Sequence, residues 1–158
     1  MAMTLFEKAI SQPSRSSSMN QLQYSPVSKL INSYAKAGRK DEARDLLLKQ
    51  LAASSVDNYD PAYAAYQRLG SQEWAAKKFQ EMELPVDAMK LYRKMLDDPQ
   101  AMASASQFNG RGPDYYEKIA RTGMSTALAT VDVSNATQVI AELLTVPETL
   151  KAGTAGVD

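Results

Sequence analysis

The stretch LINSYAKAGRKDEARDLL, residues 30–47, decides the fold of this chain. Apolar residues recur at helical spacing on both sides of Gly38, which predicts two amphipathic helices joined by a tight turn. The apolar stripe of the first helix consists of Val27, Leu30, Ile31 and Tyr34. The stripe of the second helix consists of Ala43, Leu46, Leu47 and Leu51. Because each stripe is narrow, we expect the two helices to bury their apolar faces against each other.

The same order of residue types returns later in the chain at two competing spacings. Within residues 34–50 the order is aromatic, glycine, alanine and large apolar, formed by Tyr34, Gly38, Ala43 and Leu47. A spacing of 32 residues pairs these positions with Tyr66, Gly70, Ala75 and Phe79. A spacing of 45 residues pairs the aromatic, alanine and large apolar positions with Phe79, Ala88 and Tyr92. The glycine supplies a left-handed turn and the alanine a close helix approach. How the helices pair after residue 70 stays open at this point.

Most of the other expected helices begin at a proline. A capping residue precedes proline at Ser25-Pro26, Asp60-Pro61 and Asp98-Pro99, and Pro85 and Pro113 begin two further helices. Alternation typical of a strand is limited to residues 131–133. The chain is therefore predicted to be all-α, with about eight helices and an additional short one over residues 3–10.

Glycines and serines give the expected helix ends in the second half of the chain. We expect Gly70 and Gly123 to end helices, because glycine is common just beyond a helix C-terminus. Ser71 and Ser134 are expected to cap the helices that follow. The last of these helices would direct Val139, Ile140 and neighbouring leucines inward.

Residues 30–47 resemble a tetratricopeptide-type repeat, and the same unit also resembles a pentatricopeptide repeat. The match is carried by Tyr34, Gly38, Ala43 and Leu47. Residues 66–82 match more loosely, and residues 85–97 resemble an isolated second helix of such a unit. The resemblance implies antiparallel helix pairs stacked as a short right-handed α-solenoid, in families that bind many unrelated partners.

The chain is expected to divide into four segments. A short helix and a serine-rich linker occupy residues 1–24, and the repeats that resemble tetratricopeptide units occupy residues 25–98. Divergent helices or a cap occupy residues 99–150, and a flexible tail occupies residues 151–158. Such a chain is also consistent with one segment of a longer repeat protein or a subunit of a larger assembly.

The composition removes most common catalytic groups from consideration. The chain has no cysteine and no histidine, so disulfides, thiolate nucleophiles, histidine-ligated zinc and imidazole bases are absent. Its 18 basic and 18 acidic residues balance, whereas a dedicated nucleic-acid binder normally carries a basic surplus. No arrangement of carboxylates and hydroxyls predicts acid–base catalysis. We therefore expect a protein that is not an enzyme and has no cofactor and no metal site.

The sequence also carries a prediction about location. No stretch approaches the ~18 consecutive apolar residues of a membrane span. Glu7 and Lys8 interrupt the region where a signal peptide would be apolar. We expect a cytoplasmic protein with no membrane partner.

Candidate partner-binding residues lie on the first helix and just before the third. In helical repeats the first helix of each pair lines the concave groove, and here its polar residues outside the core stripe are Lys29, Asn32, Ser33 and Lys36. Asn32 and Lys36, one turn apart, can jointly hold a carboxylate or a carbonyl. Tyr59 is the member of an aromatic group, with Tyr63 and Tyr66, that is expected to be most exposed. The alternatives are an ordinary solvated face and ordinary packing between helices.

The loop over residues 109–113 offers one more candidate. Backbone amides near Gly110 and Gly112, together with Arg111, can receive a phosphate, but the loop lacks the lysine and spacing of a Walker motif. A plain connector is the alternative.

These observations predict a non-catalytic protein–protein interaction module or scaffold. It would bind a peptide or protein partner in the concave groove of a helical repeat. The alternative is a pentatricopeptide-like RNA-binding protein, which would read bases through side chains at fixed repeat positions. Neutral charge and a single closely matching unit favour the protein partner over a nucleic acid.

Overall fold

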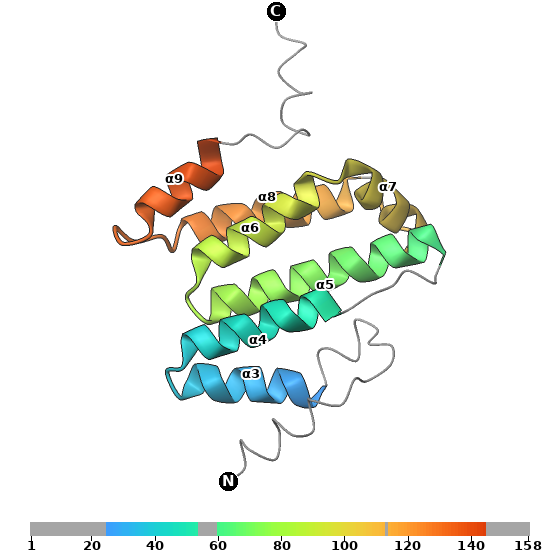
Figure 1. The fold of residues 1–158 in the computed structure, drawn as a ribbon. Coiled ribbons are helices and arrows are strands. Elements are labelled where there is room, and N and C mark those ends of the chain that lie inside the picture. Colours follow the sequence, from blue (N-terminus) through green and yellow to red (C-terminus); the bar gives the residue numbers. More distant parts are fainter. Residues whose placement is uncertain (1–24, 54–59, 113, 145–158) are drawn as a thin grey trace, which may run out of the picture. The chain divides into compact units, whose positions relative to one another are not determined.

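The structure, a computed structural model, is all-helical over the residues that it describes, 25–53, 60–112 and 114–144 (Figure 1). Its helices are α3 (Pro26–Lys36), α4 (Lys40–Ala53), α5 (Pro61–Glu81), α6 (Pro85–Leu96), α7 (Pro99–Phe108), α8 (Tyr115–Leu128) and α9 (Ala136–Leu144). No strand occurs in these ranges, and residues 131–133 lie in the connection between α8 and α9. The prediction of an all-α fold is confirmed.

Several expectations concern residues outside the described ranges. They are the helix over residues 3–10, the serine-rich linker, Tyr59 and the tail over residues 151–158. The chain divides into two compact units, Met1–Asn58 and Tyr59–Asp158, which are described one at a time. The expected segment boundaries near residues 25, 99 and 151 stay predictions.

Side-chain caps begin three of the helices where the sequence predicts them. Ser25 Oγ accepts from the Ser28 amide at 3.2 Å, at the start of α3. Asp60 Oδ1 accepts from the Ala62 amide at 2.9 Å, at the start of α5. Asp98 Oδ1 accepts from the Ala101 amide at 3.0 Å, at the start of α7. Each cap satisfies an amide that has no partner inside its helix, which fixes where the helix begins.

Turns of the same backbone type end α3, α5 and α7. In each case a residue with positive φ follows the helix: Gly38 at 75°, Glu83 at 59° and Gly110 at 67°. The amide of the following residue then donates a hydrogen bond to a carbonyl five residues earlier. These bonds run from Arg39 to Tyr34 at 2.9 Å, from Leu84 to Phe79 at 2.8 Å and from Arg111 to Ser106 at 3.0 Å. This is the Schellman arrangement, which satisfies carbonyls at the helix end. Gly38 and Glu83 are 45 residues apart, so the first two of these turns follow the longer of the two predicted spacings.

Glu83 is the non-glycine residue with positive φ among the described residues, and its replacement should stabilise the protein. We expect Glu83→Gly to raise the free energy of unfolding by about 0.5–1 kcal/mol, because a Cβ strains this conformation. Gly38→Ala should lower it by about 1 kcal/mol, although open space surrounds that position. Urea melts measure both changes. A loss of stability in Glu83→Gly would contradict the strain at this turn.

Gly70 and Ser71 do not divide α5, so the expected helix end and cap are wrong. The helix runs without a break from Pro61 to Glu81, and both residues are buried in its interior. The Ser71 hydroxyl donates to the Gln67 carbonyl at 2.9 Å, one turn back, instead of capping a new helix. Glycine costs only about 1 kcal/mol in a helix interior, and burial of α5 on several sides offsets that cost.

Gly123 likewise lies inside a helix, and α8 continues past it to Leu128. An ideal Cβ at Gly123 would lie 2.2 Å from Cζ of Tyr92, which belongs to α6. The glycine therefore allows α6 and α8 to approach closely at this point. Ser134 is not a cap either: its amide and hydroxyl both donate to Asp132 Oδ1, in the turn before α9.

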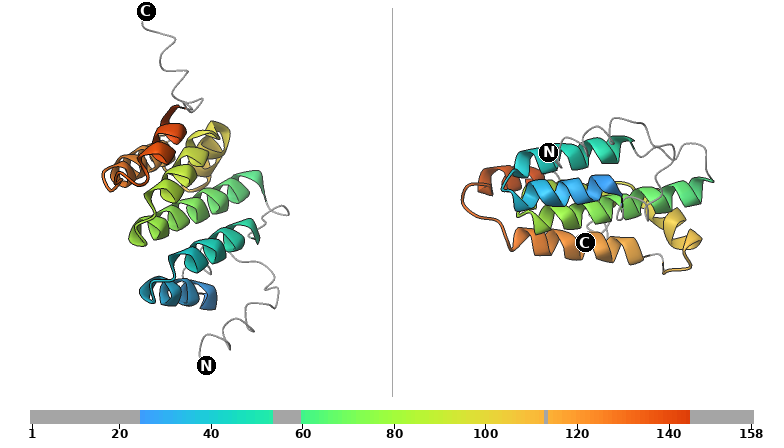
Figure 2. Two further views of the ribbon diagram at one scale, coloured as in Figure 1. Left: turned by 60° about the vertical axis from the view of Figure 1, so that its left-hand side comes forward. Right: turned by 90° about the horizontal axis from the view of Figure 1, so that it is seen from below.

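In the Tyr59–Asp158 unit, α5 lies beside α6, α7 and α8, and α8 also packs on α6 (Figures 1 and 2). The core is formed by apolar residues from all four of these helices, among them Leu69, Phe79, Ala88, Tyr92, Met95, Ala105 and Ala120. In the Met1–Asn58 unit, α3 packs on α4 through Leu30, Ile31, Tyr34, Ala43 and Leu47. Ile140 of α9 was expected to face inward but is 56% exposed. The seven helices of the described ranges compare with about eight predicted, because α5 joins the two helices that were predicted on either side of Gly70.

Candidate functional site

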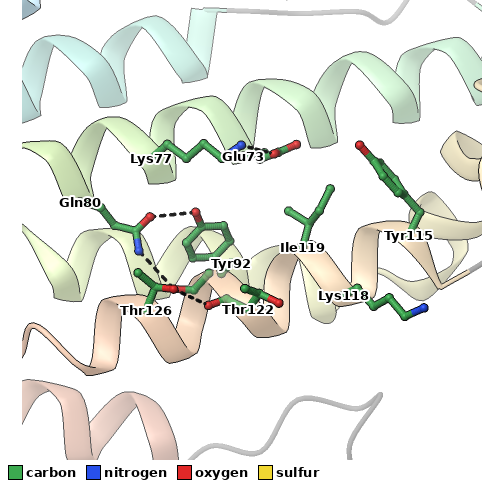
Figure 3. Close-up of a pocket in the computed structure, with 10 residues that line it drawn as sticks. Glu73, Lys77, Gln80, Tyr92, Tyr115, Lys118, Ile119, Thr122 and Thr126 are labelled. Carbon is green, nitrogen blue, oxygen red and sulfur yellow. Dashed lines mark hydrogen bonds and ion pairs between the residues drawn. The ribbon is translucent and has the colours of Figure 1, made fainter.

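An open groove lies between α5 and α8, and α6 forms its floor (Figure 3). Its volume is about 490 Å³, and ten residues line it: Glu73, Lys77, Gln80, Tyr92, Tyr115, Lys118, Ile119, Thr122, Gly123 and Thr126. The two helices run in the same direction along it, with Gln80 and Thr126 at one end and Tyr115 at the other. The size is that of a site for a small ligand or a short peptide segment. We call this feature the α5–α8 groove.

A half-buried chain of hydrogen bonds closes one end of the α5–α8 groove. The Tyr92 hydroxyl donates to Gln80 Oε1 at 3.1 Å, and Gln80 Nε2 donates to the Gly123 carbonyl at 3.2 Å. Tyr92 is 1% exposed and Gln80 is half-buried, so both bonds are partly shielded from water. They join α6, α5 and α8 at one point and hold the end of the groove in a fixed shape.

The two lysines on the rim are each paired with a carboxylate. Lys77 Nζ lies 2.5 Å from Glu73 Oε1, and Lys118 Nζ lies 2.6 Å from Asp114 Oδ2. The lysine side chains are 60% and 75% exposed, so both pairs contribute little to stability. The hydrogen bond from Lys118 holds the pKa of the Asp114 carboxyl below its usual value. Along these four residues, the rim carries balanced charge.

Burial is the main cause of a raised pKa at both tyrosines on this side of the unit. It raises the pKa of Tyr92 to about 12, and the negative charge of Glu73 adds to the effect. Burial also raises the pKa of Tyr116, which is 2% exposed. Both hydroxyls therefore stay neutral in the folded protein across the physiological range, where Tyr92 donates a hydrogen bond to Gln80 and Tyr116 accepts one from Asn109.

The raised pKa of Tyr92 predicts a loss of stability at high pH. A tyrosine ionises near pH 10 in the unfolded chain but near pH 12 at this site, so the stability it contributes is complete below pH 10. Above pH 10 the free energy of unfolding should fall by about 1.4 kcal/mol per pH unit for this group, until about pH 12. Urea melts at pH 8 to 11, followed by Trp74 fluorescence, measure the slope. Tyr92→Phe should reduce it, and an unchanged slope would contradict the assignment.

Aromatic side chains gather at the end of the unit where α5 and α8 begin and α7 ends. The Phe108 ring lies 5.3 Å from the rings of both Tyr63 and Tyr66, between centroids. The next residue, Asn109, donates from Nδ2 to the Tyr116 hydroxyl at 3.0 Å, and the Tyr115 and Tyr116 rings are 5.1 Å apart. We call the set formed by Tyr63, Tyr66, Phe108, Tyr115 and Tyr116 the aromatic end. Tyr115 belongs both to it and to the α5–α8 groove.

The four predicted binding residues of α3 form one exposed face of that helix. Lys29, Asn32, Ser33 and Lys36 are all exposed and lie away from the buried stripe. The Ser33 hydroxyl donates to the Lys29 carbonyl at 2.9 Å, so it already has one partner. These residues belong to the Met1–Asn58 unit, whereas the α5–α8 groove belongs to the other unit. The fifth predicted residue, Tyr59, lies outside the described ranges.

Sequence reasoning missed the α5–α8 groove, because its two walls lie more than 30 residues apart in the chain. Tyr63 and Tyr66 were singled out, but their partner Phe108 was not, and Phe79 is fully buried. One signal was available: Tyr66, Glu73, Lys77 and Gln80 share one face of a helix only if α5 is continuous. Because Gly70 was interpreted as the end of a helix, these four residues were not recognised as one helix face.

The hydrogen bonds of the candidate phosphate loop differ from those of a loop that binds phosphate through its amides. Gly110 forms the turn after α7, and the Arg111 amide donates to Asn109 Oδ1 at 3.0 Å. The Asp114 carboxylate stands at the start of α8, where it occupies the position that favours an anion. The structure therefore favours the alternative to a phosphate site, a plain connector between α7 and α8.

Among the described residues, no group of three or more acidic side chains is placed to hold a metal ion. No helix in the same ranges combines the length and the apolar character needed to cross a bilayer. No family model, curated protein or solved structure matches the chain.

Proposed function

We propose that this protein is a non-catalytic interaction module that binds a segment of a protein partner in the α5–α8 groove. The observation that carries the proposal is the groove itself, an open channel about 490 Å³ in volume between two parallel helices. Its lining combines the Tyr92 ring of α6 at the floor and Ile119 of α8 on one wall with hydroxyl and charged groups along the walls. Sites that bind side chains of a partner combine apolar contact with a few polar groups in this way.

We also propose that the helices stack as a short α-solenoid. Three Schellman turns of the same form support this idea, because equivalent helix pairs need equivalent turns. Within the Tyr59–Asp158 unit, α7 packs on α5 and α8 packs on α6, so the pair α7–α8 repeats the placement of α5–α6. The resemblance of residues 30–47 to a tetratricopeptide-type unit agrees with this arrangement.

Blocking the groove should weaken binding strongly without unfolding the protein. We would select peptides for the full chain from a displayed library of random dodecapeptides and measure their affinity by fluorescence polarisation. Thr122→Trp places a large side chain in the groove from an exposed position, and should weaken selected peptides about tenfold or more. A surface change of this kind alters stability by no more than ~0.5 kcal/mol, which circular dichroism and urea melts can verify.

Ser125→Trp is the matched control, because Ser125 is exposed on the same helix but does not line the groove. It should bind the selected peptides as the unchanged protein does. If the double variant Asn32→Ala/Lys36→Ala loses binding while Thr122→Trp keeps it, the partner site lies on α3 and the groove proposal is wrong.

A further inference from the structure

The charges around the α5–α8 groove are balanced except at one position. Glu73 pairs with Lys77, and Asp114 pairs with Lys118. Arg111 is exposed, and no carboxylate among the described residues pairs with its guanidinium. One uncompensated positive charge therefore lies beside Tyr115, the lining residue at one end of the groove.

Arg111 does not itself line the groove, but it contacts Tyr115, which does. Its guanidinium carbon is 5.2 Å from the centroid of the Tyr115 ring, and Tyr115 lines the groove. Stacking on an aromatic ring orients a guanidinium and leaves its N–H groups free for a carboxylate. Figure 3 shows Tyr115 and Ile119 rising from α8 toward α5, so an apolar surface adjoins the charge.

We propose that the α5–α8 groove binds an acidic segment of a protein partner, with a side-chain carboxylate on Arg111 and a neighbouring apolar side chain against Tyr115 and Ile119. The inference rests on the proposed function and adds the chemistry of the partner. Arginine and tyrosine together are the residue types that most often dominate the binding energy of protein interfaces. A carboxylate is the group that matches the forked donors of a guanidinium.

A single-stranded RNA fits these observations less well. Its phosphates need several cations along their path, whereas Glu73 and Asp114 place negative charge beside the two rim lysines. Its bases need open aromatic faces for stacking, whereas Arg111 already covers one face of Tyr115. The observations therefore favour an acidic peptide.

The test uses the full chain and the random dodecapeptide library. We expect enriched peptides to carry Asp or Glu within about three residues of an aliphatic or aromatic side chain, since Arg111 stacks on Tyr115 and Ile119 follows Tyr115 by one turn of α8. A fluorescein-labelled copy of the most enriched peptide should bind about tenfold more weakly to Arg111→Gln than to the unchanged protein. The same peptide with its acidic residues changed to the corresponding amides should lose a similar factor in affinity for the unchanged protein. Arg111→Gln should not weaken the binding of this amide peptide further.

Lys94→Gln is the control for loss of one positive charge, because Lys94 is exposed on α6 and does not line the groove. It should leave the affinity unchanged. Enriched peptides without acidic residues, or equal binding by Arg111→Gln, would overturn the inference. If Thr122→Trp still abolishes that binding, the groove function stands while the acidic partner does not. Binding of a labelled twelve-nucleotide oligouridine, lost in Arg111→Gln and with no peptide enriched, would overturn both in favour of RNA.

Discussion

Gly123→Ala should lower the free energy of unfolding of the Tyr59–Asp158 unit by about 2–3 kcal/mol. An alanine Cβ would lie 2.2 Å from Tyr92 Cζ and 2.5 Å from each of its Cε atoms, and the ring is fully enclosed. The ring or the whole of α8 must then move, which is overpacking, with a typical cost of about 1–3 kcal/mol. The hydrogen-bonded chain from Tyr92 through Gln80 to the Gly123 carbonyl would also be disturbed. Urea melts followed by Trp74 fluorescence measure the change.

The control is the same substitution in a protein that lacks the ring. In a Tyr92→Leu background, Gly123→Ala should be neutral or stabilising by up to about 1 kcal/mol, because alanine favours the helix more than glycine does. The change in the free energy of unfolding caused by Gly123→Ala differs between the two backgrounds by the coupling free energy of positions 92 and 123. Equal losses in both backgrounds would mean that the close approach of α6 and α8 does not depend on this glycine.

Replacing either of two enclosed alanines by leucine should be the next most damaging change. Ala43 and Ala88 are each 0% exposed, and each lies in the second helix of a pair, five residues after the left-handed residue of the turn. A leucine adds three carbon atoms where no space is present, so each change should cost about 1–3 kcal/mol. Circular dichroism during urea unfolding measures the effect for Ala43→Leu, and Trp74 fluorescence measures it for Ala88→Leu.

Ala53→Leu is the matched control, since Ala53 is exposed at the end of α4. It should change stability by no more than ~0.5 kcal/mol. If the three variants lose equal stability, the alanines after the turns have no special packing role and the 45-residue correspondence between the two helix pairs loses its physical basis.

The fold was predictable from the sequence wherever a short-range signal and the tertiary packing agree. Ser25, Asp60 and Asp98 cap helices because each needs only the amides two or three residues ahead. In α6 the apolar residues at helical spacing are all buried, since that helix contacts neighbours on several sides; they are Ala88, Leu91, Tyr92, Met95 and Leu96. Local geometry and local spacing are sufficient for such features.

Prediction failed where long-range packing decides between two local options. Gly70 and Gly38 look alike in sequence, yet one lies inside a helix and the other forms a turn. Glu83 gives no sequence signal for positive φ, because the turn is imposed by the pairing of α5 with α6. The groove depends on α5 and α8 together, and no pattern within either helix indicates that they lie side by side. Of the residues in the proposed acidic-peptide site, Arg111 was a candidate in advance, but for a phosphate.

The close packing of Tyr92 against Gly123 has a consequence for the order in which the chain matures during synthesis. The pair α5–α6 is complete once Leu96 has left the ribosome, and its short turn favours early closure. Until α8 follows, however, nothing from that helix covers the Tyr92 ring, and Gln80 lacks the carbonyl that fixes it. The nascent unit thus exposes an aromatic surface for the time needed to translate about 27 further residues, roughly one to five seconds at common elongation rates. Over that interval this surface is available to a chaperone, and it closes when Gly123 arrives.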